Sequence, residues 1–431
     1  MLLHYCPQCG SKLQPGFKFC PACGEKLPCP MVDPAEPAEL APGPPHPAVN
    51  LGAVKASASS TLTRSPIRTT RRRSIKMPSS PAPTPVALLQ TAPHAVNVFL
   101  SVFSAKGRGK RAKRVCAVEP VQEGTEVCDQ SGKKWRLVKL LYQTEVELTY
   151  EVQQASRGTT SDDWMHILRM GTKDGQMFVE QNFLQRAAKP IAVEKWMKKY
   201  SMDFLGIPAC VGFGIYETYR FLIFPDMGQT LQSVVDREES LPERAVLQLA
   251  IQLLDALEFI HENEYAHADL HAGNIYVTTN GQRTKVFLSG FGHAFRFCPG
   301  GNHVEYRESS RTPHQGNLNF ISVDSHKGVG PSRRSDVQSL GYCLLSWMTG
   351  TLPWGGITQR NSAIFAEKER YMSDIHGLMS YCFKKRKVSG ALQCYLTQAM
   401  GLNYTEKPNY SLLKTGLNES LQKMGGRVYL K

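Results

Sequence analysis

A long segment without acidic residues divides this chain and limits how much of it can fold. Between residues 40 and 118 there is no Asp or Glu, while thirteen Lys and Arg residues fall there, nearly the whole formal net charge of +14. Pro is dense from residue 28 onward, and Ser, Thr and Ala are frequent later. Such a segment buries too little apolar surface to offset the entropy lost on ordering. The sequence therefore predicts a short module over residues 1–27, a disordered basic linker over 28–115 and a globular part over 116–431.

The composition of the 431-residue chain fits a globular protein with a sizeable core, since 42% of its residues are hydrophobic and 9% are aromatic. No run of 18 or more apolar residues exists, so we expect no transmembrane helix and no membrane partner. The first residues lack the basic and apolar regions of a signal peptide. These features favour a reducing, intracellular compartment.

Four of the twelve cysteines form two close pairs near the N-terminus. Cys6 and Cys9 make the first pair, Cys20 and Cys23 make the second, and a Gly follows each pair. Because C-x-x-C spacing lets two thiolates bind one ion, the two pairs supply a tetrahedral four-thiolate site. A module this small has no core of its own, so zinc binding would provide its folding free energy. The sequence predicts a structural zinc ribbon; the alternative is four free or redox-active cysteines.

Two basic clusters lie in the linker. The first contains Arg71, Arg72 and Arg73. The second contains Lys106, Arg108, Lys110, Arg111, Lys113 and Arg114. Because both lie in an accessible, acid-free segment, they predict nuclear localisation through a nuclear import receptor. A solvated charge run, or weak affinity for the phosphate backbone of nucleic acid, is the alternative.

The globular part begins with strand-like sequence and continues with helix-like sequence. Residues 135–152 have the β-branched and aromatic content of two strands, and 164–170, 211–216 and 219–224 resemble further strands. Between them, residues 178–188 read as a helix that ends before Pro190. The order predicts an α+β protein with two lobes joined near residue 226.

A long helix is expected in the second lobe. Ser240 and Glu243 have the spacing of a capping box at its start. The apolar residues that follow at helical spacing are Val246, Ala250, Leu253, Leu257 and Ile260.

The most informative stretch of the globular part runs from residue 267 to residue 292. It opens with His-Ala-Asp, and Asn274 follows Asp269 by five residues. At this spacing, in phosphoryl transfer, the aspartate accepts the proton of the substrate hydroxyl and the asparagine holds a magnesium ion. Where a second aspartate should precede Phe and Gly and hold the metal, the chain has Gly290. The stretch thus keeps one half of a phosphoryl-transfer site and lacks the other.

Other motifs resemble those of a known family. The sequence SRRSDVQSLGY over residues 332–342 and LPW over 352–354 are similar to the casein-kinase-1 group of protein kinases. QRAAKP over 185–190 and FCPGG over 297–301 resemble the vaccinia-related kinases within that group. With the zinc ribbon and the basic linker, the likeness is strongest to the pseudokinase branch of this family. It implies a two-lobed protein-kinase-like fold with a β-rich N-lobe and a helical C-lobe.

The parts that bind ATP depart from the family pattern. The three Gly positions of the phosphate-binding loop are occupied by Tyr142, Thr144 and Glu147. Arg169 stands in place of the strand lysine, with Glu180 as its partner, and Arg and Lys are not interchangeable at a tight site. Because the metal-binding aspartate is also missing, we expect neither ATP nor magnesium to bind and no active catalytic residue.

The remaining motif residues have structural interpretations. By resemblance, His267 and Phe291 belong to the apolar spine that links the lobes, and Asp336 braces the His-Ala-Asp loop. We expect Asp269 to hydrogen-bond within its own loop. Phe224 falls near the back of the nucleotide cleft, where its ring would help to fill it.

Three functions remain open. The favoured one is a nuclear pseudokinase that acts as a scaffold or allosteric regulator; the resemblance implies MAP-kinase signalling through a dual-specificity phosphatase. The first alternative is a weak or atypical Ser/Thr kinase that uses Asp269 as base. The second is nucleic-acid binding through the ribbon and linker, which requires a steep salt dependence that is lost when residues 60–115 are deleted.

Overall fold

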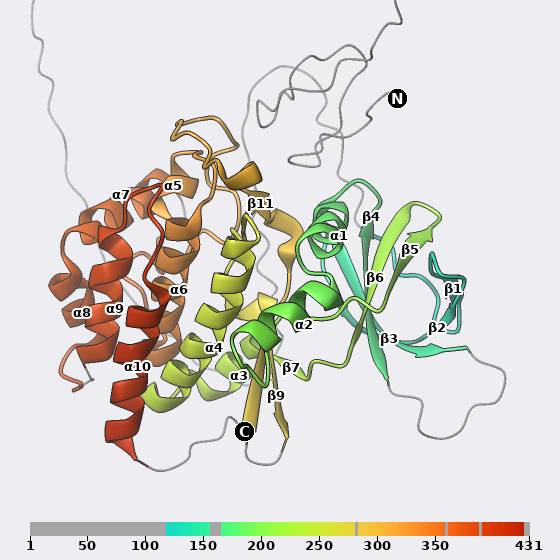
Figure 1. Ribbon diagram of the computed structural model, residues 1–431, viewed down its shortest axis with the longest axis horizontal. Coiled ribbons are helices and arrows are strands. Elements are labelled where there is room, and N and C mark those ends of the chain that lie inside the picture. The colour runs from blue at the N-terminus through green and yellow to red at the C-terminus, as the bar shows by residue number, and fades with distance from the viewer. Residues whose placement is uncertain (1–117, 156–164, 281–282, 358–360, 388–389, 426–431) are drawn as a thin grey trace, which may run out of the picture. The chain divides into compact units, whose positions relative to one another are not determined.

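The computed structural model of this chain describes residues 118–155, 165–280, 283–357, 361–387 and 390–425. The four cysteines of the predicted zinc ribbon and both basic clusters lie outside the described residues. The described part has a strand-rich lobe followed by a helix-rich lobe (Figure 1), which confirms the predicted α+β, two-lobed fold. None of the described helices is long and apolar enough to cross a membrane.

The first lobe is built on a six-stranded antiparallel sheet with strand order β1-β2-β3-β4-β6-β5. Its core side of β2 and β3 contains Trp135, Leu137 and Tyr150, which are fully or almost fully buried. The β-branched and aromatic content that predicted strands here also packs this core, because such side chains fill a pleated surface well. The strands are β1 Glu126–Cys128, β2 Lys134–Gln143, β3 Glu147–Gln154, β4 His166–Thr172, β5 Gly212–Tyr216 and β6 Tyr219–Pro225.

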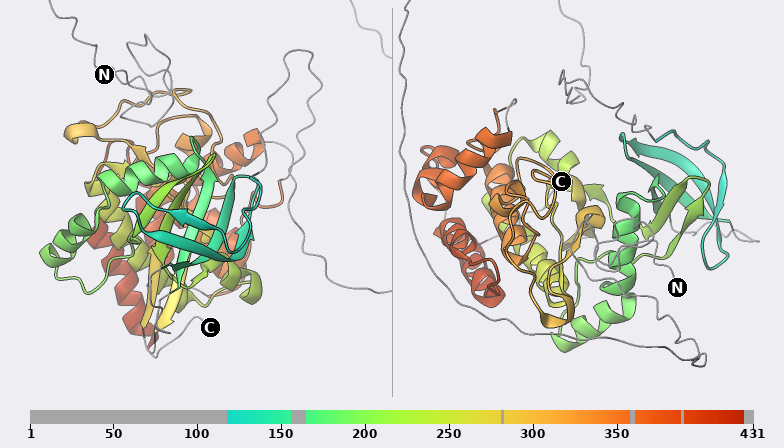
Figure 2. Two further views of the ribbon diagram at one scale, coloured as in Figure 1. Left: turned by 90° about the vertical axis from the view of Figure 1, so that its right-hand side faces the viewer. Right: turned by 90° about the horizontal axis from the view of Figure 1, so that it is seen from above.

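Two helices connect β4 to β5. α1 Gln176–Arg186 packs on β4 and β6, and seen from above it lies between the sheet and the helical lobe (Figure 2). α2 Pro190–Lys199 was not predicted, because Pro190 was interpreted only as a stop signal. Pro190 is instead the first helical residue of α2, where its missing N–H costs nothing and its fixed φ angle suits the helix.

The second lobe is mainly helical, and α4 and α6 lie at its centre. Besides these helices it contains two small sheets, of order β10-β9-β7 and β11-β8. Its strands are β7 Gln229–Thr230, β8 Tyr265–Ala266, β9 Ile275–Asn280, β10 Arg283–Leu288 and β11 Phe295–Arg296. Its helices are α3 Leu231–Glu238, α4 Glu243–Glu262, α5 Val323–His326, α6 Arg333–Thr349, α7 Asn361–Met372, α8 Ile375–Phe383, α9 Gly390–Gly401 and α10 Tyr410–Met424, with 3₁₀ turns η1 Ala272–Asn274, η2 Phe291–His293 and η3 Pro299–Gly301.

The start of α4 differs from the prediction, while its buried face agrees with it. All five apolar residues predicted for that face are at most 1% exposed. The capping box of Ser240 and Glu243 is wrong: Pro242 is the N-cap, and no side chain caps the helix. A capping box occurs instead at α6, between Ser332 and Ser335. Short polar residues are frequent near helix starts, so their spacing alone does not show which of the two helices, α4 or α6, has the capping box.

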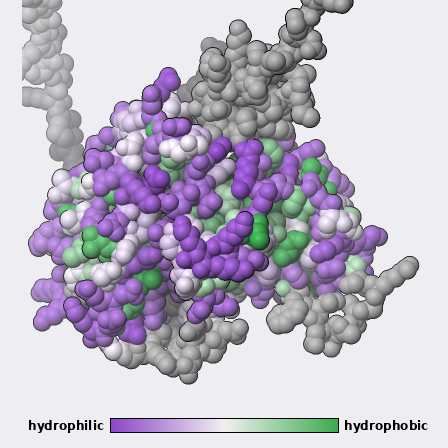
Figure 3. Space-filling view, viewed as in Figure 1, coloured by the Kyte–Doolittle hydropathy of each residue, from purple (hydrophilic) through white to green (hydrophobic). Residues whose placement is uncertain are grey.

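The face of the molecule in Figure 3 is mostly hydrophilic, with small hydrophobic groups between the polar side chains. This is the normal surface of a globular protein. The segment from residue 267 to residue 292 runs through β9 and β10 and ends at η2, which contacts α1. The fold therefore places the predicted catalytic stretch at the junction of the two lobes.

Candidate active site

One buried carboxylate fixes the loop that begins at His267. Asp336 of α6 is fully buried and accepts hydrogen bonds from the backbone N–H groups of His267 at 2.6 Å and Ala268 at 2.8 Å. Its Oδ2 atom also lies 2.8 Å from Nε2 of His261 on α4, and the other ring nitrogen of His261 pairs with the hydroxyl of Tyr410. Two helices and the loop are therefore joined at one carboxylate, which is the role that the family resemblance implied for Asp336.

Aromatic stacking continues this connection into the first lobe. The ring of Phe291 stacks on Phe183 of α1 at 4.1 Å between centroids and lies 4.9 Å from the ring of His267. Burial lowers the pKa of His267, so the ring is neutral. Its Nε2–H donates to the carbonyl of Ser289 at 2.8 Å, and its Nδ1 accepts the N–H of Asp269 at 3.2 Å. The structure thus places His267 and Phe291 in a packed column between the lobes.

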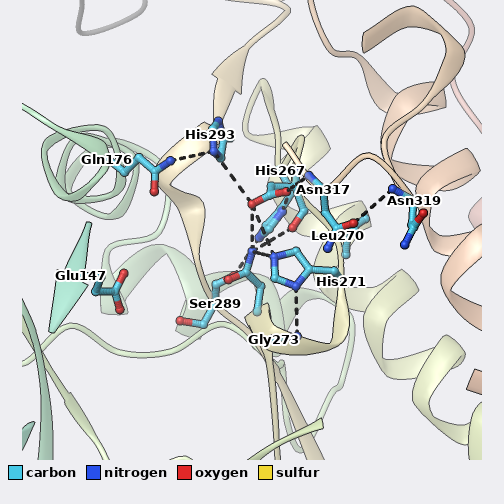
Figure 4. Close-up of polar contacts among 12 residues, drawn as sticks. Glu147, Gln176, His267, Leu270, His271, Gly273, Ser289, His293, Asn317 and Asn319 are labelled. Atoms are coloured by element: carbon cyan, nitrogen blue, oxygen red, sulfur yellow. Dashed lines mark hydrogen bonds and ion pairs between the residues drawn. The ribbon is translucent and has the colours of Figure 1, made fainter. Parts of the chain in front are cut away.

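Asp269 makes polar contacts with His271, His293 and Asn317, which are labelled in Figure 4. Its Oδ1 accepts the backbone N–H of Asn317 at 3.0 Å, and its Oδ2 lies 3.6 Å from Nε2 of His271. Burial alone would raise the pKa of this carboxyl, but the interactions with His271, His293 and Asn317 outweigh burial and hold the pKa well below its usual value. Asp269 is therefore an ionised carboxylate whose acceptor positions already serve the surrounding loops.

The two histidines beside Asp269 were missed by the sequence reasoning. His271 follows Asp269 by two residues, and its Nδ1 accepts the N–H of Gly273 at 3.1 Å. His293 comes directly after the Gly-Phe-Gly motif, 2.9 Å from the side chain of Gln176 and 4.0 Å from Asp269. The available signal was their closeness in the chain to the two motifs.

Asn274 and Gly290 lie against each other. Asn274 turns toward its own loop and donates from Nδ2 to the backbone carbonyl of Asp269 at 2.9 Å. Gly290 has a φ of 76°, and a Cβ atom added there would lie 2.2 Å from Oδ1 of Asn274. The amide of Asn274 therefore fills the space that a side chain at residue 290 would need.

Arg169 on β4 joins two carboxylates and is 6% exposed. Its Nε and Nη2 donate to Glu147 at 2.6 and 2.8 Å, and its Nη1 donates to Glu180 at 2.7 Å. Burial alone would lower the pKa of the guanidinium, but these two carboxylates hold the pKa well above its usual value. Nη1 also lies 3.3 Å from the hydroxyl of Ser289. Arg169 is thus charged, and its Nε, Nη1 and Nη2 atoms all donate to carboxylates.

The three residues at the expected glycine positions of the phosphate-binding loop make different contacts. Glu147 reaches Arg169 and is 20% exposed. Thr144 closes the turn between β2 and β3, because its Oγ1 accepts the N–H of Glu147 at 2.9 Å. Tyr142 is 64% exposed. Only Glu147 of the three therefore reaches Arg169. Phe224, expected near the back of the nucleotide cleft, is fully buried in the hydrophobic core.

Metal ligands are not grouped in the part of the chain that the structure describes. Within it, no three or more His, Cys, Asp or Glu side chains are arranged to hold a metal ion. His271 and His293 both contact Asp269, at 3.6 and 4.0 Å.

Two family models match the chain. A protein kinase domain matches residues 188–402, and a zinc-ribbon domain matches residues 5–27. The second range contains all four paired cysteines and supports a structural zinc ion there.

Relatives and a solved structure extend this match. Serine/threonine-protein kinase VRK3 of Mus musculus is 44% identical over 321 residues, 73% of this chain and 71% of the relative. Serine/threonine-protein kinase VRK2 of Homo sapiens is 36% identical over 72% of this chain and 61% of its own length. A solved structure of vaccinia related kinase 3 has a TM-score of 0.65 and 43% identity, and covers 71% of this chain and 93% of that one. The chain therefore belongs to the vaccinia-related kinase family.

The backbone at Ala268 provides a test of loop strain. Ala268 has a φ of 69°, in the left-handed region that favours glycine. We expect Ala268→Gly to raise the free energy of unfolding by about 1 kcal/mol, because it removes the Cβ clash of that conformation. Ala272→Gly, in the neighbouring turn η1, is the matched control and should lower it by up to about 1 kcal/mol. Urea denaturation of both variants measures the difference; equal effects would contradict the prediction.

The environment of Asp269 predicts a pH dependence. A carboxyl whose folded pKa is lowered stabilises the fold above its unfolded pKa of about 3.9, and this contribution is lost as the pH falls. Asp269→Asn should therefore lower the free energy of unfolding by about 2 kcal/mol at pH 6, and the gap from wild type should narrow as the pH falls from 4 toward 2.5. Urea denaturation across this range measures the gap, and a gap independent of pH would refute the role of the charge.

Proposed function

We propose that this chain is a nuclear pseudokinase that acts as a scaffold or allosteric regulator in signalling. The observation that carries the proposal is the pair between Glu147 and Arg169. In a phosphoryl-transferring site a strand cation binds the nucleotide phosphates. Here Glu147 of the same chain takes the Nε and Nη2 donors of Arg169 and Glu180 takes Nη1, so a phosphate would have to displace an ion pair with distances of 2.6–2.8 Å.

A second observation concerns the metal position and supports the same proposal. Residue 290 carries no carboxylate, and Asn274 fills the space where one would begin. Magnesium on a nucleotide is normally held through one or two carboxylates together with the phosphates. Asp269 is ionised, but it is committed to Asn317 and the neighbouring histidines. We therefore propose that neither ATP nor magnesium is a functional ligand.

The proposed role then depends on surfaces that bind partner proteins rather than on catalytic turnover. The brace at Asp336 and the stack of Phe183, Phe291 and His267 support a rigid shell that does not need nucleotide for its integrity. Family resemblance suggests MAP-kinase pathways, through a dual-specificity phosphatase, as the signalling context. The basic clusters of the linker suggest import into the nucleus by an import receptor.

A thermal-shift titration of the full chain with ATP tests the closed site. A ligand at 100 times its dissociation constant adds about 2.7 kcal/mol of stability, which raises the melting temperature of a domain this size by several degrees. We expect no shift with up to about 5 mM ATP, with or without magnesium, because Glu147 holds Arg169. A clear magnesium-dependent stabilisation would overturn the pseudokinase proposal.

Two variants sharpen that titration. Glu147→Ala releases Arg169, and we expect a small, metal-independent shift with ATP in this variant only. Glu145→Ala on the same turn is the matched control, because Glu145 makes no contact with Arg169 in the described structure, and it should behave as wild type. Equal responses in both variants would show that the pair between Glu147 and Arg169 is not what closes the site.

The alternative is a weak or atypical Ser/Thr kinase. The names of the relatives as serine/threonine-protein kinases favour it. Asp269 stands at the position of the base, but its lowered pKa makes it a weak proton acceptor. Nucleic-acid binding through the ribbon and linker is a further candidate, and only the charge of residues outside the described structure favours it.

An assay of radiolabelled phosphate transfer to a basic protein substrate distinguishes the kinase alternative from the pseudokinase proposal. If Asp269 is a working base, Asp269→Asn should reduce transfer by at least about 10²-fold, since positioned bases contribute on that scale. We expect no transfer above background from wild type. Transfer that survives Asp269→Asn unchanged would be assigned to a contaminating kinase, and transfer that Asp269→Asn abolishes would establish the alternative.

A further inference from the structure

Four consecutive cations form an exposed turn on the helical lobe, outside the nucleotide site. Lys384, Lys385, Arg386 and Lys387 follow the end of α8, and all four are exposed. None of them has a carboxylate within ion-pair distance among the residues that the structure describes. α8 lies on the side of the helical lobe away from the sheet (Figure 1), so this basic turn is remote from Asp269 and Arg169.

A hollow of about 290 Å³ lies beside the basic turn. Its apolar floor is made by Leu241, Met348 and Phe383, each at most 6% exposed. Arg386 and Lys387 line its rim, and the guanidinium of Arg386 lies 5.9 Å from the ring centroid of Phe383. The remaining lining residues are Ser240, Pro242 and Glu243.

The size of the hollow limits its occupant. Pockets for whole small-molecule ligands usually measure about 300–1,000 Å³ and bury most of the ligand. This hollow is at the lower end of that range and opens to the surface, so it suits one or two apolar side chains of a larger partner. An apolar centre with a charged rim is the usual composition of a protein-docking site.

The charge of the rim selects the chemistry of the partner. Arg386 and Lys387 line the hollow and adjoin the exposed Lys384 and Lys385, and Glu243 is the one carboxylate among the lining residues that the structure describes, so this surface is positive. Acidic side chains would pair with the rim and speed association, while an apolar side chain would fill the floor. A nucleic-acid backbone offers phosphates but no apolar side chain for Leu241, Met348 and Phe383.

We propose that the basic turn 384–387 and the adjoining hollow form a docking site for an acidic peptide segment of a partner protein, with an apolar side chain of that segment seated between Leu241, Met348 and Phe383. The site gives the proposed scaffold a second surface that is separate from the nucleotide cleft. It does not require the nucleotide site to be closed, so a kinase with an open site could use it equally well.

Binding is measured with the full chain and a fluorescein-labelled peptide of sequence EDELLEDE, by fluorescence anisotropy without nucleotide. Replacement of Lys385, Arg386 and Lys387 by Glu should weaken binding at least about ten-fold, because it reverses the charge of the rim. Replacement of Lys195, Lys198 and Lys199 of α2 by Glu changes the net charge equally at another exposed site, and it should alter the affinity less than about two-fold. Equal weakening by both triple variants would overturn the proposal.

The floor is tested without a change of charge. Ser240→Trp places a bulky ring at the edge of the hollow and should also weaken EDELLEDE at least about ten-fold, whereas wild type should bind the peptide EDESSEDE as weakly as the variant binds EDELLEDE. If Ser240→Trp binds normally, the attraction is only electrostatic and the docking site is refuted. Melting temperatures of the variants exclude unfolding as the cause.

The position of the bound peptide is mapped by photo-crosslinking. EDELLEDE with a benzophenone group in place of one leucine should crosslink to residues 240–243 or 383–387 of the full chain. Crosslinks confined to the basic linker, residues 60–115, would contradict the proposal. So would displacement of the peptide from residues 383–387 by a 20-base-pair DNA duplex at lower concentration than by unlabelled peptide, which would assign the surface to nucleic acid.

Discussion

The buried carboxylate of Asp336 is the interaction on which the junction of the lobes depends. It receives the N–H groups of His267 and Ala268 and contacts His261, so it joins α6, α4 and the loop in one place. A buried carboxylate is costly unless each of its oxygens is paired, and here both are. Because it fixes the backbone at His267, it also fixes the ring that packs on Phe291 and, through it, α1 of the first lobe.

The part of the site that would face a nucleotide differs from the part around Asp336. Behind the loop, polar partners and stacked rings join the two lobes. In front of it, Arg169 is held by Glu147, and Asn274 fills the space beside Gly290. Each of these contacts uses a group that phosphoryl transfer would direct at the nucleotide or the metal. The two halves of the site therefore differ: the first joins the lobes, and in the second Glu147 pairs with Arg169 and Asn274 lies against Gly290.

Much of the fold could be predicted from the sequence, because hydrophobic periodicity and family motifs act locally. The strands β2 to β6, the helix α1 and the buried face of α4 all lie where the pattern placed them. Errors arose at element boundaries. Pro190 begins α2 although it was interpreted as a stop, and Ser240 does not cap α4. In both cases the same residue type is compatible with two backbone positions, and only the packing of the neighbouring elements selects one.

For the candidate site, the sequence by itself determined the family, the paired cysteines at the N-terminus, and the residue types that stand at each kinase position. It showed that Glu147, Arg169 and Gly290 depart from the pattern, since this requires only their identity and order. Only the tertiary structure decided what these residues do instead. Glu147 and Arg169 are 22 residues apart in the chain, and Asp269 and Asn317 are 48 apart, so their contacts depend on strand register and loop placement. The contact of His293 with Asp269 and the hollow beside Phe383 likewise depend on packing, because each is formed by segments that are apart in the chain.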